Sequence, residues 1–236
     1  MKTLQAVGVA AILGLGSLGA QAATINFDGF SNGYNITSVD YTGGTMTITD
    51  VKRKTRNGMV DSQAWAYDTE ESGNGDDDLF AEFYAATATA YQAVDYYDVN
   101  DSIRPGNVLI IQEDPSEGAT PDDNARGGSY WLNFSSAVTL HSIDVFDLKT
   151  NKISFALDNG DIFYNKLYSD TSNDKTPNLY ETMYFGDAKV SSIFVELHGA
   201  SGAIDNIKLL ATPLPAAVWL FGSVLLGFAG IRRFKK

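Results

Sequence analysis

The chain has 236 residues, with 17 Lys and Arg against 29 Asp and Glu, two His and no Cys. The lack of Cys excludes disulfides, thiolate metal sites and thiol catalysis. The net charge of −12 argues against a nucleic-acid partner, since phosphate binding needs clustered basic residues. A chain of this length that is 44% hydrophobic can bury a substantial core, so the composition indicates an acidic globular protein.

Residues 1–22 have the pattern of a secretory signal peptide. Lys2 precedes an apolar run over residues 4–18, and Ala20 and Ala22 form an A-x-A cleavage pattern. We expect cleavage after Ala22 or one residue later. A buried N-terminal helix is the alternative, but four glycines between residues 8 and 19 disfavour it, because Gly is a poor helix former.

Residues 23–211 are predicted to form one all-β domain, a jelly-roll-like β-sandwich of about ten strands. Polar and apolar residues alternate over 129–134 and 142–145, while 108–111 is a continuous apolar run typical of a buried strand. Many short strands separated by Gly, Asn and Asp favour a sandwich. Residues 80–90 are the only candidate for a helix of ten residues or more in this domain.

Two further strand signals stand near the end of this domain. Asn159-Gly160 separates the β-rich runs 153–157 and 162–164, which predicts a hairpin with a type I′ turn. Residues 203–209 are predicted to form the last strand.

Two groups of carboxylates are candidate metal ligands. Asp76, Asp77 and Asp78 follow a Gly-rich segment, and Ca²⁺ prefers six to eight oxygen ligands. An acidic loop exposed to water is the simpler alternative. Asp28 follows the first predicted strand and Asp205 lies in the last. In many carbohydrate-binding jelly rolls these strands lie side by side near a structural Ca²⁺. The alternative is that both residues bind backbone amides in turns.

The sequence contains no recognisable catalytic motif. Glycoside hydrolysis requires two carboxyls at a fixed separation, and Glu82, Glu113 and Glu196 are examples of acids that could supply them. Ser–His–Asp catalysis would need His141 or His198, which lie in predicted strands. The many Tyr and Trp residues could stack on sugar rings in a lectin-like groove, or simply pack in the core.

The C-terminal segment 212–236 has the pattern of a membrane anchor. An uncharged apolar run over residues 216–231 follows Pro213, Leu214 and Pro215, and it is long enough to span most of a bilayer core. A stop-transfer basic cluster ends the chain, and basic residues of this kind are retained on the cytoplasmic side. The cluster comprises Arg232, Arg233, Lys235 and Lys236. A core helix with a solvated basic tail is the alternative.

This order of Pro213-Leu214-Pro215-Ala216, apolar run and basic end resembles the PEP-CTERM sorting signal, in its Pro-Leu-Pro-Ala subclass from Gram-negative bacteria. Thr212 departs from that pattern, where Val is usual. The resemblance implies an inner-membrane-tethered precursor cut by an exosortase-like membrane protease near the Pro-Leu-Pro segment. It also implies release to the cell surface or extracellular matrix.

The segments around residues 76–78, 106–113 and 121–128 resemble an arrangement in exported proteins of this type whose activity is not established. Nothing in that resemblance supplies a reaction.

The sequence therefore favours a non-catalytic binding or structural module that acts near extracellular polysaccharide, with Ca²⁺ as the one candidate cofactor and no nucleic-acid partner. A secreted carbohydrate-active hydrolase or lyase is the alternative from another class, and a permanently anchored receptor is a third. Without the two terminal segments, which hold five basic residues and no acid, the domain carries 12 basic and 29 acidic residues, a net charge of −17. Such a domain repels anionic polymers unless cations bridge them.

Overall fold

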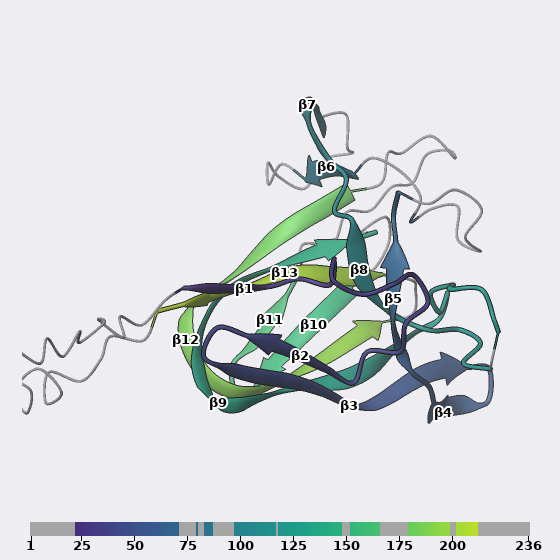
Figure 1. The fold of residues 1–236 in the computed structure, drawn as a ribbon, viewed down its shortest axis with the longest axis horizontal. Helices are drawn as coiled ribbons and strands as arrows, with labels where there is room; N and C mark the ends of the chain where they lie inside the picture. Colours follow the sequence, from purple (N-terminus) through teal and green to yellow (C-terminus); the bar gives the residue numbers. More distant parts are fainter. Residues whose placement is uncertain are drawn as a thin grey trace, which may run out of the picture. The chain divides into compact units, whose positions relative to one another are not determined.

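The computed structural model describes residues 22–70, 79, 83–86, 97–116, 118–147, 152–165, 179–198 and 202–211 (Figure 1). Within these ranges every regular element is a β-strand and none is a helix. The prediction of an all-β domain is therefore confirmed for the described part of the chain. The strands are β1 (Ala23–Ile25), β2 (Ser38–Tyr41), β3 (Gly44–Thr55), β4 (Gly58–Asp61), β5 (Ala64–Asp68), β6 (Phe83–Ala86), β7 (Tyr97–Ile103), β8 (Asn107–Ile111), β9 (Gly127–Phe146), β10 (Lys152–Leu157), β11 (Ile162–Tyr164), β12 (Leu179–His198) and β13 (Ala203–Leu210).

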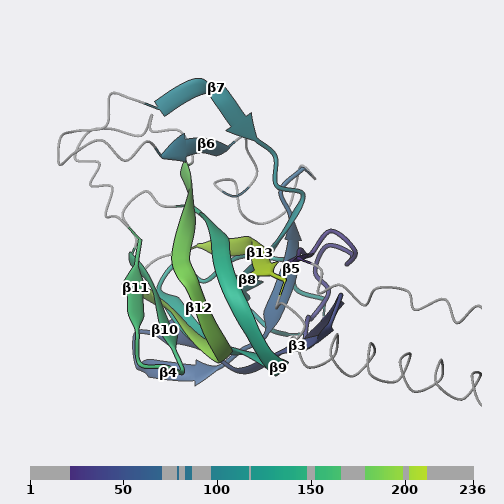
Figure 2. The same cartoon turned by 90° about the vertical axis from the view of Figure 1, so that its left-hand side faces the viewer.

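All 13 strands belong to one hydrogen-bonded sheet. Its main path runs β11-β10-β12-β9-β13-β8-β5, and Figure 2 shows the first four of these strands side by side. Neighbours pair antiparallel except β12 and β6, which pair in parallel. The strand β9 connects the parts of the sheet, because it pairs with β12 along most of its length, with β3 near its start and with β13 near its end. This pairing lets one sheet curve around a core.

The two faces of the sheet bury different apolar clusters. In β5, Ala64 and Ala66 belong to the main core. The alternate residues Trp65 and Tyr67 belong to a second cluster on the opposite face. This alternation follows from the two-residue period of a strand. All five residues of β8 are buried, which confirms the buried strand predicted from residues 108–111.

The first and last strands of the described chain lie side by side, as the sequence predicts. β1 pairs antiparallel with β13, with Ile25 opposite Ile207, and the two strands run together in Figure 1. The remainder of β13 lies between β9 and β8. The end of β1 and the start of β8 therefore both reach the same stretch of β13.

The predicted hairpin at residues 153–164 forms, but its turn is not type I′. β10 and β11 pair antiparallel, with Phe155 opposite Phe163. A type I′ turn needs positive φ at both central residues, whereas only Gly160 has it, at +95°. The Gly160 N–H donates to the Leu157 carbonyl at 3.0 Å, and the Leu157 N–H donates to the Asp161 carbonyl at 2.8 Å. The turn is therefore followed by a glycine bulge.

Two other expectations about elements are corrected. The predicted strands 129–134 and 142–145 are parts of the single 20-residue β9, which continues through three exposed residues, 135–137. The register with β3 ends at Phe134, the register with β13 ends at Thr139, and the register with β12 shifts between Asn133 and Val138. Residues 135–137 therefore join the two paired halves of β9 at a bulge. Within the candidate helix 80–90, Phe83–Ala86 instead forms β6, because its backbone pairs with β7 and β12.

The terminal predictions lie mostly outside the described residues. Residues 1–21 and 212–236 are not described, so the signal peptide, the Pro-Leu-Pro-Ala motif and the basic cluster stay predictions. Of the two cleavage-site alanines, only Ala22 is described, and it is exposed immediately before β1. Among the described residues, no helix has the length and apolar character to cross a membrane.

Candidate binding pocket and buried carboxylate cluster

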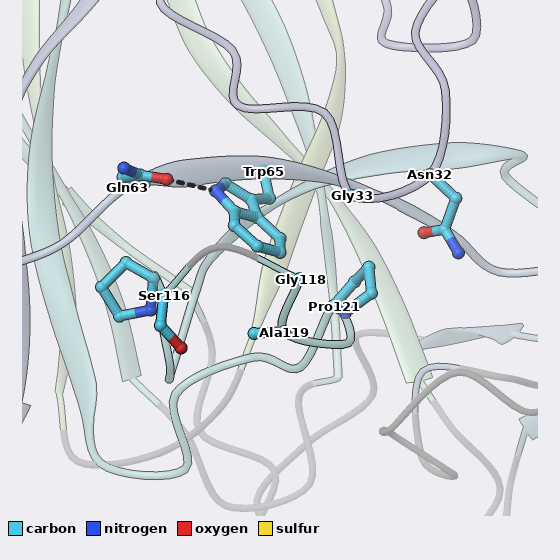
Figure 3. A pocket seen from close by; sticks show the side chains of 9 residues that line it. Asn32, Gly33, Gln63, Trp65, Ser116, Gly118, Ala119 and Pro121 are labelled. Atoms are coloured by element: carbon cyan, nitrogen blue, oxygen red, sulfur yellow. Dashed lines mark hydrogen bonds between the residues drawn. The ribbon is translucent and has the colours of Figure 1, made fainter.

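An open pocket of about 450 Å³ lies between three segments of the domain (Figure 3). Its volume lies within the range of about 300–1,000 Å³ that small-molecule sites occupy. Every described residue that lines it is uncharged. These residues are Asn32, Gly33, Gln63, Trp65, Pro115, Ser116, Gly118, Ala119 and Pro121.

Trp65 is the aromatic residue among the described residues that line this pocket. The indole Nε1–H donates to Gln63 Oε1 at 2.8 Å, and this bond orients the ring (Figure 3). The rest of the indole packs in the second apolar cluster, so Trp65 is only 7% exposed. The pocket therefore has a rigid aromatic wall next to amide groups.

The loop across from Trp65 is held by one buried side chain, that of Gln112. Its Nε2 donates to the carbonyls of Asp114 at 3.0 Å and Thr120 at 2.9 Å, and its Oε1 accepts the Asp122 N–H at 3.0 Å. Gln112 is 0% exposed and uses three of its four amide bonding positions on this loop. It therefore fixes the loop that carries five of the nine lining residues.

The Ser116 corner of the same loop is stabilised from within. The hydroxyl and the N–H of Ser116 both donate to Asp114 Oδ1, at 2.8 and 3.1 Å. These two bonds lower the pKa of the exposed Asp114 carboxyl. Asp114 therefore stabilises the conformation of the loop at Ser116, although it is not one of the residues that line the pocket.

The third segment, residues 28–35, is hydrogen-bonded to β5. Asn32 Oδ1 accepts the Asp68 N–H at 3.1 Å, and the Gly33 N–H donates to the Ala66 carbonyl at 2.8 Å. Gly33 has a φ of +77°, and a Cβ there would meet Pro121 at 3.1 Å. A glycine is thus needed where this segment approaches the pocket loop.

A cluster of three carboxylates lies on the neighbouring part of the sheet. Asp205 of β13 is directly opposite Asp144 of β9 in the strand register. Asp28, just beyond β1, is near enough to raise the pKa of Asp205. The structure therefore brings the predicted pair Asp28 and Asp205 together and adds Asp144.

The environment of Asp205 is unfavourable for a charge. Burial raises its pKa to about 8, the nearby backbone N–H groups of Asn206 and Phe27 oppose the shift, and the carboxylates of Asp28 and Asp144 add to it. Neither oxygen of Asp205 has a hydrogen-bond partner in bonding geometry, although the residue is only 1% exposed. Among the described residues, no group of three or more acidic or His side chains has the arrangement of a metal site.

The two histidines lie outside both of these regions. His198 Nε2 is 2.9 Å from Ser154 Oγ and 3.6 Å from Glu196 Oε2. In a catalytic triad the carboxylate binds the other ring nitrogen and so fixes the tautomer. Here hydroxyl and carboxylate meet the same nitrogen, so this group lacks the triad arrangement. His141 Nδ1 contacts Asp187 Oδ1 at 2.8 Å on an exposed surface.

Several acids proposed from the sequence are placed elsewhere or not described. Glu113 is exposed in the loop after β8, and Glu196 is half-buried on β12. Glu82 and the Asp76–Asp78 triplet lie outside the described residues.

Sequence reasoning missed the pocket and the role of Asp144. In the sequence Trp65 is one of many aromatic residues, and no local pattern connects it with Pro121 or Asn32. The alternation over residues 142–145 predicts an exposed Asp144, and only the register of β9 with β13 places it beside Asp205.

No known family model matches this chain, and no curated protein is significantly similar to it.

Proposed function

We propose that this chain is an exported protein of the cell surface or extracellular matrix whose β domain binds uncharged polysaccharide without cleaving it. The terminal segments support export: the resemblance to a signal peptide and to a PEP-CTERM tail implies tethering at the inner membrane and cleavage by an exosortase-like protease. The curved sheet is, on this proposal, a jelly-roll-like sandwich. Such folds hold ligands in surface loops, and loops often carry function.

The observation that carries the binding proposal is the pocket beside Trp65. Sugars present apolar ring faces and many hydroxyls, and the pocket offers an indole, three amide or hydroxyl side chains and no described charge. A domain with a net charge of −17 would repel anionic polymers, which further favours a neutral glycan.

A hydrolase would need two carboxyls across the bound sugar. None of the described residues that line the pocket is acidic. This lining favours binding over hydrolysis at this site.

Glycan-array binding by the full-length chain, purified in mild detergent, tests the proposal. We expect neutral glycans to bind and Ser116→Phe, which fills the pocket from an exposed position, to weaken binding at least about tenfold. Ser191→Phe, at an exposed site on β12, is the matched control. Trp65→Phe should weaken binding as well, whereas Trp131→Phe on β9 should not.

Three results would count against the proposal. Binding that Ser116→Phe leaves unchanged would exclude the pocket, and new reducing ends released from a bound polysaccharide would show an enzyme. The mass of the protein exported by a bacterium with an exosortase tests sorting separately. An intact segment 213–236 after export would refute the sorting proposal and leave the pocket unaffected.

A further inference from the structure

The hairpin of β3 and β4 is a basic feature of a strongly acidic domain. Four of the 12 basic residues in residues 23–211 stand within five positions of β3 and the following turn: Lys52, Arg53, Lys54 and Arg56. Segment 50–61 holds these four and the acids Asp50 and Asp61, which leaves 8 basic and 27 acidic residues in the rest of the domain. The positive charge of the domain is thus concentrated in one hairpin.

Two of the four cations face an acid of the same domain, and two are open. Lys52 Nζ forms an ion pair with Asp61 Oδ1. Arg53 is half-buried, and its charge acts on the Asp114 carboxyl, whose pKa is lowered mainly by hydrogen bonds within its own loop. The other two side chains are exposed, and neither forms an ion pair with a described acid: Lys54 and Arg56.

Strand β4 is an open edge of the sheet. Among the described strands it pairs with β3 alone, and it lies at the lower margin of the view in Figure 1. All four of its residues are exposed, Met59 at 48% and Val60 at 38%. In an antiparallel pair every second residue turns its N–H and C=O away from the partner strand. The outer edge of β4 therefore offers backbone donors and acceptors beside two apolar side chains.

This edge lacks the features that usually prevent strand pairing. Edge strands are commonly protected by Pro, by Lys or by a bulge. β4 contains neither Pro nor Lys, and its register with β3 has no shift. The turn before it is fixed, because the Thr55 hydroxyl accepts the Asn57 N–H at 3.2 Å and donates to the Gly58 carbonyl at 2.8 Å. The edge is therefore held ready for a further strand.

We infer that this hairpin binds an extended acidic segment of a partner protein, which adds to the sheet as a strand beside β4. In such strand addition the main chain supplies hydrogen bonds, and alternate side chains supply specificity. Lys54 is directly opposite Met59 in the register, so a cation and an apolar side chain share one face of the hairpin. A segment that alternates apolar and acidic residues complements both.

Charge complementarity favours an acidic partner over a neutral one. The Debye length at physiological salt is about 8 Å, so the cations of the hairpin act on a bound segment more strongly than acids on distant surfaces do. A lipid surface or an anionic polysaccharide offers negative charge but no ladder of peptide N–H and C=O groups. The inference goes beyond glycan binding, because no residue of segment 50–61 lines the pocket.

The competing explanation is that the hairpin attracts any polyanion. Three probes separate the two explanations: the peptide Glu-Val-Glu-Val-Glu-Val, the same peptide with every backbone nitrogen methylated, and dextran sulfate. Methylation removes the N–H donors and keeps the charge. Strand addition needs these donors, whereas attraction between charges does not.

Fluorescence anisotropy of the labelled peptide with the full-length chain, in an uncharged mild detergent, tests the inference. We expect the double variant Lys54→Glu, Arg56→Glu to weaken peptide binding at least about tenfold. The double variant Lys189→Glu, Lys208→Glu makes the same charge change at exposed positions of β12 and β13 and should retain the affinity. The methylated peptide should bind the wild type at least about tenfold more weakly than the unmodified one. Peptide binding should also slow amide hydrogen exchange within β4.

Four outcomes would overturn the inference. These are no binding of the unmodified peptide, equal binding of the methylated peptide, equal loss of affinity in both double variants, or dextran sulfate that binds as tightly as the peptide. Both substituted side chains of the hairpin are exposed, so their replacement should not prevent folding. None of these outcomes bears on the Trp65 pocket, which the glycan array tests separately.

Discussion

Replacing Asp205 with Asn should make the protein more stable at neutral pH when divalent cations are removed. The folded-state pKa of Asp205 is about 8, against an ordinary value of 3.8. Between these two pH values the folded protein holds one more proton than the unfolded chain, so the free energy of unfolding falls as the pH rises. Asn cannot titrate, and its NH₂ group can donate to the neighbouring carboxylates of Asp28 or Asp144.

The size of the effect follows from the difference between the two pKa values. Each unit corresponds to about 1.4 kcal/mol, so the full penalty above pH 8 is about 6 kcal/mol. Below about pH 4 the penalty vanishes, because both states are protonated. Between pH 5 and pH 7.5 the wild type should therefore lose about 3 kcal/mol relative to Asp205→Asn. Losses of that size are large beside the total stability of a domain, which is about 5–15 kcal/mol.

Urea unfolding at pH 5, 6, 7 and 7.5 in the presence of a chelator measures this difference. Glu70→Gln is the control, since it removes an exposed carboxylate. Taking the difference between variant and wild type cancels the titration of all other groups. If the wild type and Asp205→Asn lose stability in parallel as the pH rises, the carboxyl is not held in an environment that disfavours its charge.

Two further substitutions test the packing that supports the pocket and the sheet. Gly128→Ala should destabilise the protein by about 2–3 kcal/mol, because the added Cβ would collide with the Lys52 carbonyl oxygen of the paired strand β3. Gly29→Ala is the control: a Cβ there meets nothing within 4 Å, so the urea midpoint should change little. Equal midpoints for the two variants would contradict this account of β9 pairing. Gln112→Leu removes all three bonds to the pocket loop and should cost about 2 kcal/mol of stability and weaken glycan binding. Retention of full affinity in the array would show that the loop keeps its shape without Gln112.

The parts of the fold that the sequence predicts well are those with a local cause. β8 is predictable because a strand buried on both faces is a continuous apolar run. The β10–β11 hairpin follows from two β-rich runs around Asn159-Gly160, but its turn type does not, since the φ of Asn159 depends on the loop length that pairing selects. The length of β9 cannot be predicted from local sequence, because its two halves pair with different strands, β3 and β13, and residues 135–137 join these halves at a bulge.

The candidate sites are harder to predict than the strands, because their residues come from separate parts of the sequence. The pairing of β1 with β13 could be expected by analogy with carbohydrate-binding jelly rolls, and it brings Asp28 towards Asp205. Asp144 joins them only through the register of β9 with β13. The pocket is assembled from three segments between residues 32 and 121, and no periodicity relates them.

The carboxylate cluster and the pocket share one segment, residues 28–35, and a series of hydrogen bonds connects its two ends. Asp28 accepts from the Asn107 N–H, Asn107 Nδ2 donates to the Phe30 carbonyl, and residues 32–34 bond to β5. The position of the Asp28 carboxylate and the shape of the pocket wall therefore depend on the same hydrogen-bonded segment.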